Sequence, residues 1–214
     1  MNPQPILDFI GEHESEGAAR RLKISAYDVV WGGIAAKHRP AKLSAMTIAE
    51  VLAWQDSIDA LYRSEAAGRY QIMEDTLRSL YREAGMTGAD LFDRAGQDRL
   101  AVALLKRRGL EMYLDGRITL ETFCNNLARE WASLPMVSGP KRGRSYYDGD
   151  GLNKAGVDVA PFIAAVRAVS LSPKPVAVSP APDTVVKPAP AGEYPGLWAA
   201  IIAIIASFFK KERQ

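Results

Sequence analysis

Three glutamates stand close together near the amino terminus, in the stretch Gly11-Glu12-His13-Glu14-Ser15-Glu16-Gly17. Apolar residues at helical spacing over positions 6–13 predict a helix, and Gly17 is a residue that commonly ends one. This prediction places Glu16 in the last helical turn, where the helix dipole disfavours an anion. A carboxyl group that is a poor anion is a useful proton donor, so Glu16 is the candidate general acid.

Other reactive residue types are scarce in the chain. The two histidines, His13 and His38, have no cysteine or histidine neighbour at ligand spacing, so we expect no metal site and no cofactor. The single cysteine, Cys124, lies in a segment with helical apolar spacing. Such a position predicts a small buried side chain rather than a disulfide or a nucleophile.

The stretch after the acidic cluster is the only one that favours β-structure. Residues 27–31, Tyr-Asp-Val-Val-Trp, are mostly β-branched and aromatic, and Gly32 and Gly33 follow them. This pattern predicts a strand that enters a tight turn, and hence a small β-hairpin beside Glu16. Asp28 either serves there as a second carboxylate or caps the turn.

Helical patterns dominate the remaining folded part of the chain. Thr47-Ile48-Ala49-Glu50 matches a capping box, which predicts that a helix begins at this point. Further helical patterns cover residues 72–83, 93–108, 120–131 and 162–169. The sequence therefore predicts an α+β fold that is mostly α, in one domain over residues 1–171.

The composition changes after residue 171. Proline, alanine and valine dominate residues 172–193, which predicts an extended linker. Within residues 194–214, an uncharged apolar run over 196–209 precedes Lys210, Lys211 and Arg213. The run is shorter than the roughly 20 residues that span a bilayer. We expect an apolar helix that contacts a membrane through residues 196–213, with self-association as the alternative.

The bulk composition is that of an ordinary soluble domain. The chain has 214 residues, of which 48% are hydrophobic and 24% charged, and its formal net charge is +2. A charge this small does not imply a nucleic-acid-binding surface, although it would favour an anionic polymer such as a cell wall. The amino terminus, Met-Asn-Pro-Gln-Pro-Ile, lacks the features of a cleavable signal peptide.

Four short motifs together resemble a known family. Ser15-Glu16-Gly17, residues 27–33, Ala67-Gly68-Arg69-Tyr70-Gln71 and Trp131-Ala132-Ser133-Leu134-Pro135 occur in this order along the chain. Their order and intervals are similar to those of the muramidase family of the bacteriophage lambda endolysin. The resemblance covers residues 5–171 and implies a lysozyme-like helical domain.

The resemblance also implies roles for individual residues. Glu16 corresponds to the catalytic acid of that family, and Gln71 to a residue that lines the sugar cleft. Tyr70 and Arg69 either bind substrate or pack and hydrogen-bond beneath the cleft. Tyr147, or the tyrosine before it, would stand in for a cleft tyrosine.

The implied activity is cleavage of the β-1,4 bond between N-acetylmuramic acid and N-acetylglucosamine in peptidoglycan. Lytic transglycosylation needs one glutamate, because the 6-hydroxyl of the substrate closes a 1,6-anhydro ring. Hydrolysis needs a second carboxylate to bring in water. Asp28, Asp148 and Asp150 are the candidates for that second carboxylate.

Two functional interpretations follow from the resemblance. The first is a phage or prophage endolysin that waits in the cytoplasm or at the inner membrane and degrades the wall from the periplasm, with a holin as the expected partner. A wall-penetrating component of a phage particle would share its chemistry. The alternative is a membrane-tethered peptidoglycan-binding module with a muramidase fold and little activity.

Overall fold

The computed structural model describes residues 2–151 and 153–171, and these residues are mainly helical, as the sequence predicts. The predicted linker 172–193 and the predicted apolar helix within 194–214 lie outside the described residues. The α-helices are α1 (Gln4–Gly11), α2 (Gly17–Leu22), α3 (Ile48–Asp59), α4 (Glu74–Leu80), α5 (Arg94–Arg107), α6 (Leu110–Leu114), α7 (Leu120–Ala128) and α8 (Val159–Leu171).

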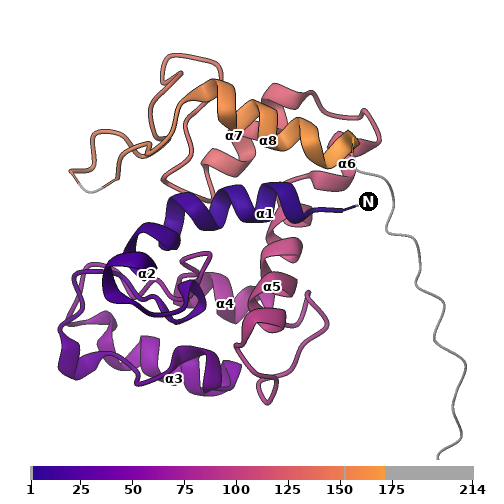
Figure 1. Cartoon of the computed structure of the whole chain (residues 1–214). Helices are drawn as coiled ribbons and strands as arrows, with labels where there is room; N and C mark the ends of the chain where they lie inside the picture. Colours follow the sequence, from indigo (N-terminus) through magenta and orange to yellow (C-terminus); the bar gives the residue numbers. More distant parts are fainter. Residues whose placement is uncertain (1, 152, 172–214) are drawn as a thin grey trace, which may run out of the picture. The chain divides into compact units, whose positions relative to one another are not determined.

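Helix α1 lies between two groups of helices (Figure 1). On one side it packs mainly against α8, which in turn packs against α7. On the other side it contacts α5, which continues through α4 to α3. The rings of Phe9 in α1 and Phe162 in α8 are stacked with their centroids 5.9 Å apart. The first helix thus connects both halves of the domain and fixes whatever side chains it carries between them.

One apolar core runs through both groups of helices. Its largest fully buried side chains include Tyr70, Phe92, Phe123 and Phe162. Cys124 is fully buried in the same core, and burial raises the pKa of its thiol to about 12. The prediction of a small buried side chain at this position is confirmed.

The first helix does not end at Gly17, contrary to the sequence prediction. One π-helical turn, Glu12–Glu16, joins α1 to α2, and the helix ends only at Lys23, which has a left-handed φ of 56°. The Ser15 hydroxyl donates a 2.8 Å hydrogen bond to the Arg69 carbonyl. A π turn is a rare local widening of a helix that is frequent at functional sites. Glu16 is therefore in mid-helix, and the dipole argument for its acidity does not apply.

The predicted β-hairpin at residues 27–33 is not formed in the described structure. Ala26–Asp28 is a 3₁₀ turn, and Val30 forms a single antiparallel bridge with Ala67. The Ser25 side chain accepts a hydrogen bond from the Tyr27 N–H and so starts the turn. High β-propensity did not produce a hairpin here because the chain pairs with the distant turn around Ala67 instead of with its own continuation.

The predicted helix ends agree better with the structure. Thr47 and Glu50 form the capping box at the start of α3, and the Asp93 carboxylate accepts a hydrogen bond from the Gly96 N–H at the start of α5. Gly109 has a φ of 101° after α5, a conformation that favours glycine. Among the helices of the described residues, none is long and apolar enough to cross a membrane.

Candidate active site

A cleft of about 500 Å³ lies where the π turn, the segment 63–73 and the segment 130–153 meet. It brings together residues from widely separated parts of the chain. The residues that line it are Glu14, Trp31, Arg63, Ser64, Ala66, Gln71, Met73, Glu130, Trp131, Ala132, Tyr147 and Asn153.

Glu14 is the glutamate of the π turn that lines this cleft. Its Oε1 accepts a 2.5 Å hydrogen bond from the Ser133 hydroxyl. Burial raises the pKa of the Glu14 carboxyl, although the hydrogen bond from Ser133 acts in the opposite direction. A carboxyl group whose protonated form is favoured, in the wall of a cleft, can donate a proton to a bound substrate.

Glu16, the candidate acid from the sequence, is not among the residues that line this cleft. Its Oε1 lies 3.4 Å from Nε of the buried Arg69, a separation that makes an ion pair. The same Nε has no hydrogen-bond partner, so the contact has the distance of an ion pair without the geometry of a hydrogen bond. The two neighbouring glutamates thus face different surroundings, Glu14 the cleft and Glu16 the arginine.

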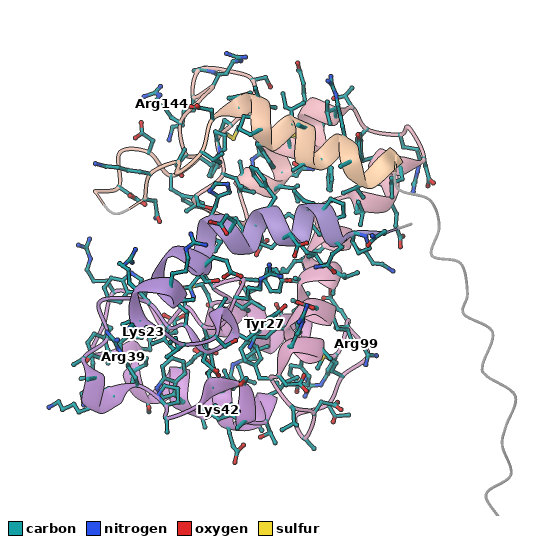
Figure 2. All side chains as sticks on the ribbon, viewed as in Figure 1. Lys23, Tyr27, Arg39, Lys42, Arg99 and Arg144 are labelled. Atoms are coloured by element: carbon teal, nitrogen blue, oxygen red, sulfur yellow. The ribbon has the colours of Figure 1, made fainter. Side chains whose placement is uncertain are left out.

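Arg69 and Tyr70 lie within a buried polar network. Nη2 of Arg69 is 3.0 Å from the Asp8 carboxylate, and the Tyr70 hydroxyl donates a 2.6 Å hydrogen bond to Asp98. Tyr27, labelled in Figure 2, donates a 2.8 Å hydrogen bond to Asp98 as well. Burial and the neighbouring Asp98 carboxylate raise the pKa of both tyrosines. These contacts match the structural alternative for Arg69 and Tyr70.

Gln71 lines the cleft, and its backbone adopts an unusual conformation. Its φ is 48°, in the left-handed region, and its side-chain amide donates a 2.7 Å hydrogen bond to the Gly68 carbonyl. Gly68 also has a positive φ, and a Cβ there would lie 2.2 Å from Oε1 of Gln97. Strained backbone is frequent at functional sites, and here the strained turn places Gln71 in the cleft wall.

Tyr147 also lines the cleft, on the loop between α7 and α8. Its hydroxyl donates a 2.7 Å hydrogen bond to the Arg129 carbonyl. The Lys141 ammonium holds the loop by donating to the carbonyls of Tyr146 and Asp148. Figure 2 labels Arg144, which belongs to this loop. The tyrosine is therefore held at its hydroxyl, and the residues on either side of it are held by Lys141.

The aspartates considered as second carboxylates make other contacts. Asp28 accepts a 2.7 Å hydrogen bond from the Ser44 N–H, and Asp148 forms an ion pair with Arg144. Asp150 accepts a hydrogen bond from the Asn153 N–H. None of the three is among the residues that line the cleft.

A second carboxylate lines the cleft together with Glu14, and it was not predicted from the sequence. Glu130 has a side chain that is only 11% exposed, and Nη2 of Arg108 lies 2.5 Å from its Oε2. The available signal was its position directly before Trp131, at the start of a motif that the sequence analysis used. Trp131 itself is buried and donates to the Tyr70 carbonyl, which fixes the segment that carries Glu130 and Ser133.

The arrangement defines a class of site: a half-buried carboxylic acid in the wall of an open cleft, with amide, hydroxyl and carboxylate groups beside it. Such a site is suited to acid catalysis on an extended substrate. No group of three His, Cys, Asp or Glu side chains suited to a metal ion occurs within residues 2–151 and 153–171.

Comparison with known families identifies the chain. The family model described as Endolysin matches residues 5–155, and the chain therefore belongs to the endolysin family. Endolysins are the peptidoglycan-cleaving enzymes of phage-induced cell lysis, and this is the activity of the chain at the level of the family. Neither the curated proteins nor the solved structures gave a match.

Proposed function

We propose that the chain cleaves the β-1,4 bond between N-acetylmuramic acid and N-acetylglucosamine, and that Glu14 is the general acid. The single observation that carries this proposal is the Glu14 carboxyl, half-buried in the cleft wall with a raised pKa and hydrogen-bonded by Ser133. Glu14 takes the role that the sequence analysis gave to Glu16, because Glu16 faces Arg69.

In the first step, Glu14 gives its proton to the glycosidic oxygen while the bond from that oxygen to C1 of the muramic acid breaks. In the second step, the Glu14 carboxylate takes the proton of the 6-hydroxyl, whose oxygen bonds to C1 and closes a 1,6-anhydro ring. One glutamate thus serves as acid and then as base. Lytic transglycosylation is the outcome that we propose for this cleft.

Hydrolysis is a second candidate outcome, and Glu130 favours it. This carboxylate lines the same cleft as Glu14 and is held against Arg108. The contact with Arg108 holds the carboxylate in place at the cleft wall. It is therefore available to orient a water molecule or to balance the positive charge that develops at C1.

The test compares wild type with Glu14→Gln and Glu16→Gln on purified peptidoglycan. Glu14→Gln should lower the turnover about 10²–10⁴-fold, the usual contribution of general acid catalysis. Glu16→Gln is the matched control and should keep most of the activity. The proposal fails if Glu16→Gln is the inactive variant, or if Glu14→Gln retains activity as a simple binding module would.

Mass spectrometry of the released muropeptides separates the two outcomes. Anhydro ends support transglycosylation, and reducing ends support hydrolysis. In the hydrolytic case Glu130→Gln should abolish the reducing ends, whereas in the transglycosylase case the anhydro product should persist.

For residues 196–213, we propose contact with a membrane, based on the apolar run and the basic residues that follow it. In this proposal the enzyme waits in the cytoplasm or at the inner membrane, a holin is a partner, and the wall is attacked from the periplasm. Liposome flotation of the full chain against a chain that ends at residue 190 tests the contact. Equal flotation of the two would refute it.

A further inference from the structure

A side pocket of about 180 Å³ adjoins the cleft. The two share several wall residues, among them Gln71, Glu130 and Tyr147. The side pocket adds two arginines, Arg108 at the end of α5 and Arg129 at the end of α7. It is too small for another pair of sugars, so it suits a single branch of the substrate.

The two arginines differ in their partners. Arg108 is neutralised by Glu130, because its Nε and Nη2 lie 2.6 and 2.5 Å from the same carboxylate oxygen. Arg129 is exposed, and within the described part of the chain it forms no ion pair. Its guanidinium carbon lies 5.3 Å from the centre of the Tyr146 ring. The side pocket thus presents one positive charge that the protein itself does not balance.

Contacts with neighbouring residues hold the Arg129 guanidinium in place. The Tyr147 hydroxyl donates to the Arg129 carbonyl, and the Lys141 ammonium lies 5.8 Å from the centre of the Tyr146 ring. The aromatic face and the tied backbone restrict the guanidinium to the mouth of the pocket. An arginine restricted in this way loses less entropy when it binds a planar anion.

The uncharged sugars of peptidoglycan give no reason for an unbalanced guanidinium. The short peptide attached to the lactyl group of muramic acid carries free carboxylates, and a guanidinium binds a carboxylate through two parallel hydrogen bonds. We propose that the side pocket binds a carboxylate of this peptide through Arg129 and thereby selects glycan strands that carry peptides. This inference rests on the proposed function.

The test uses two substrates that differ in the charge of the peptide. Glycan strands from one peptidoglycan preparation are used intact or after a carbodiimide and methylamine have converted the peptide carboxylates to methylamides; an amidase is not used, because it would leave a free lactyl carboxylate on each muramic acid. The measured quantity is the ratio of kcat/KM on strands with free carboxylates to kcat/KM on strands with capped carboxylates. Wild type should favour strands with free carboxylates, and Arg129→Gln should lower the ratio about tenfold, equivalent to about 1.4 kcal/mol.

Two further variants sharpen the test. Arg117→Gln is the matched control, an exposed arginine paired with Asp115 and outside both pockets, and it should leave the ratio unchanged. Arg129→Lys keeps the charge without the planar fork and should give an intermediate ratio.

An unchanged ratio in Arg129→Gln would overturn the inference, whether the activity on both substrates is kept or falls equally. A failure of the proposed function has a different signature, since Glu14→Gln would then retain cleavage of both kinds of strand.

Discussion

The Ser133 hydroxyl donates a 2.5 Å hydrogen bond to Glu14, from a residue 119 positions further along the chain. This bond joins the loop after α7 to the π turn at the start of the fold. It stabilises the carboxylate form of Glu14, whereas burial stabilises the protonated form. The balance between these two effects sets the pH range in which Glu14 can act as an acid.

Ser133→Ala removes the side-chain hydrogen bond that lowers the pKa of Glu14 and leaves the hydrogen bond from the Ser133 backbone and the burial in place. The pKa should rise, so the loss of activity on the alkaline side of the pH–rate profile should move to higher pH. The measurement is kcat/KM on peptidoglycan as a function of pH. Ser57→Ala, which changes a serine of α3 bonded to its own helix, is the control and should keep the wild-type profile. A shift to lower pH would contradict the assignment.

Glu14→Gln should stabilise the fold even though it abolishes activity. A carboxyl group with a raised pKa in the folded state supports folding fully below its unfolded pKa, and that support is lost as the pH rises through the folded pKa. A glutamine does not ionise and can still accept from Ser133. The Tm of the variant should therefore exceed that of wild type increasingly as the pH rises.

Glu12→Gln, in the same π turn, is the control, because the pH dependence of its effect on stability should be opposite to that of Glu14→Gln. The hydrogen bond from Arg20 lowers the pKa of Glu12, so its carboxylate supports the fold above the unfolded pKa and loses that support as the pH falls. This variant should gain no Tm at alkaline pH. Equal melting curves for Glu14→Gln and wild type at every pH would contradict the burial of Glu14.

Arg69→Met should be among the more destabilising single changes in the domain. The substitution removes the cation that Asp8 and Glu16 face and the donor to the Tyr27 and Tyr70 hydroxyls. Because the carboxylates are partly exposed, we expect a loss of about 2–4 kcal/mol in the free energy of unfolding.

Urea denaturation measures this loss. Arg69→Lys should not restore the stability, because an ammonium cannot reproduce the planar fork of a guanidinium. Arg20→Met, at an arginine whose side chain is 63% exposed, is the matched control and should cost little. A loss for Arg69→Met no larger than for Arg20→Met would contradict the role of Arg69.

Gln71→Gly should separate activity from stability. Relief of the left-handed backbone gains about 1 kcal/mol, and loss of the hydrogen bond to Gly68 costs about as much. Stability should then change by less than about 1 kcal/mol, while kcat/KM falls about tenfold because the cleft loses a polar group. Lys23→Gly, at the other described non-glycine residue with positive φ, should leave the activity intact. Full activity in Gln71→Gly would contradict its place in the binding surface.

Features that depend on near neighbours in the sequence could be predicted. The capping box of Thr47 and Glu50 needs only residues three positions apart. The burial of Cys124 followed from helical spacing alone. In each case the relevant contacts lie within one element or one turn.

Features that depend on distant contacts could not be predicted in the same way. The preference for Glu16 came from the family resemblance and from a predicted helix end at Gly17. The structure has a π turn there, and Glu14 is the glutamate of that turn that lines the cleft. Glu130 became a candidate only when its ion pair with Arg108 was visible. The hairpin prediction failed because β-propensity does not specify the partner, which is here the turn at Ala67.

The π turn also restricts insertions and deletions within residues 12–16. Glu14 lines the cleft and Glu16 faces a buried guanidinium, while Ser15 between them is bonded to the Arg69 carbonyl. Loss or gain of one codon within 12–16 would rotate everything beyond it by about 100°. A surface loop would tolerate such an insertion. Here the segment would still be a helix, but Glu14 and Glu16 would no longer face the cleft and Arg69.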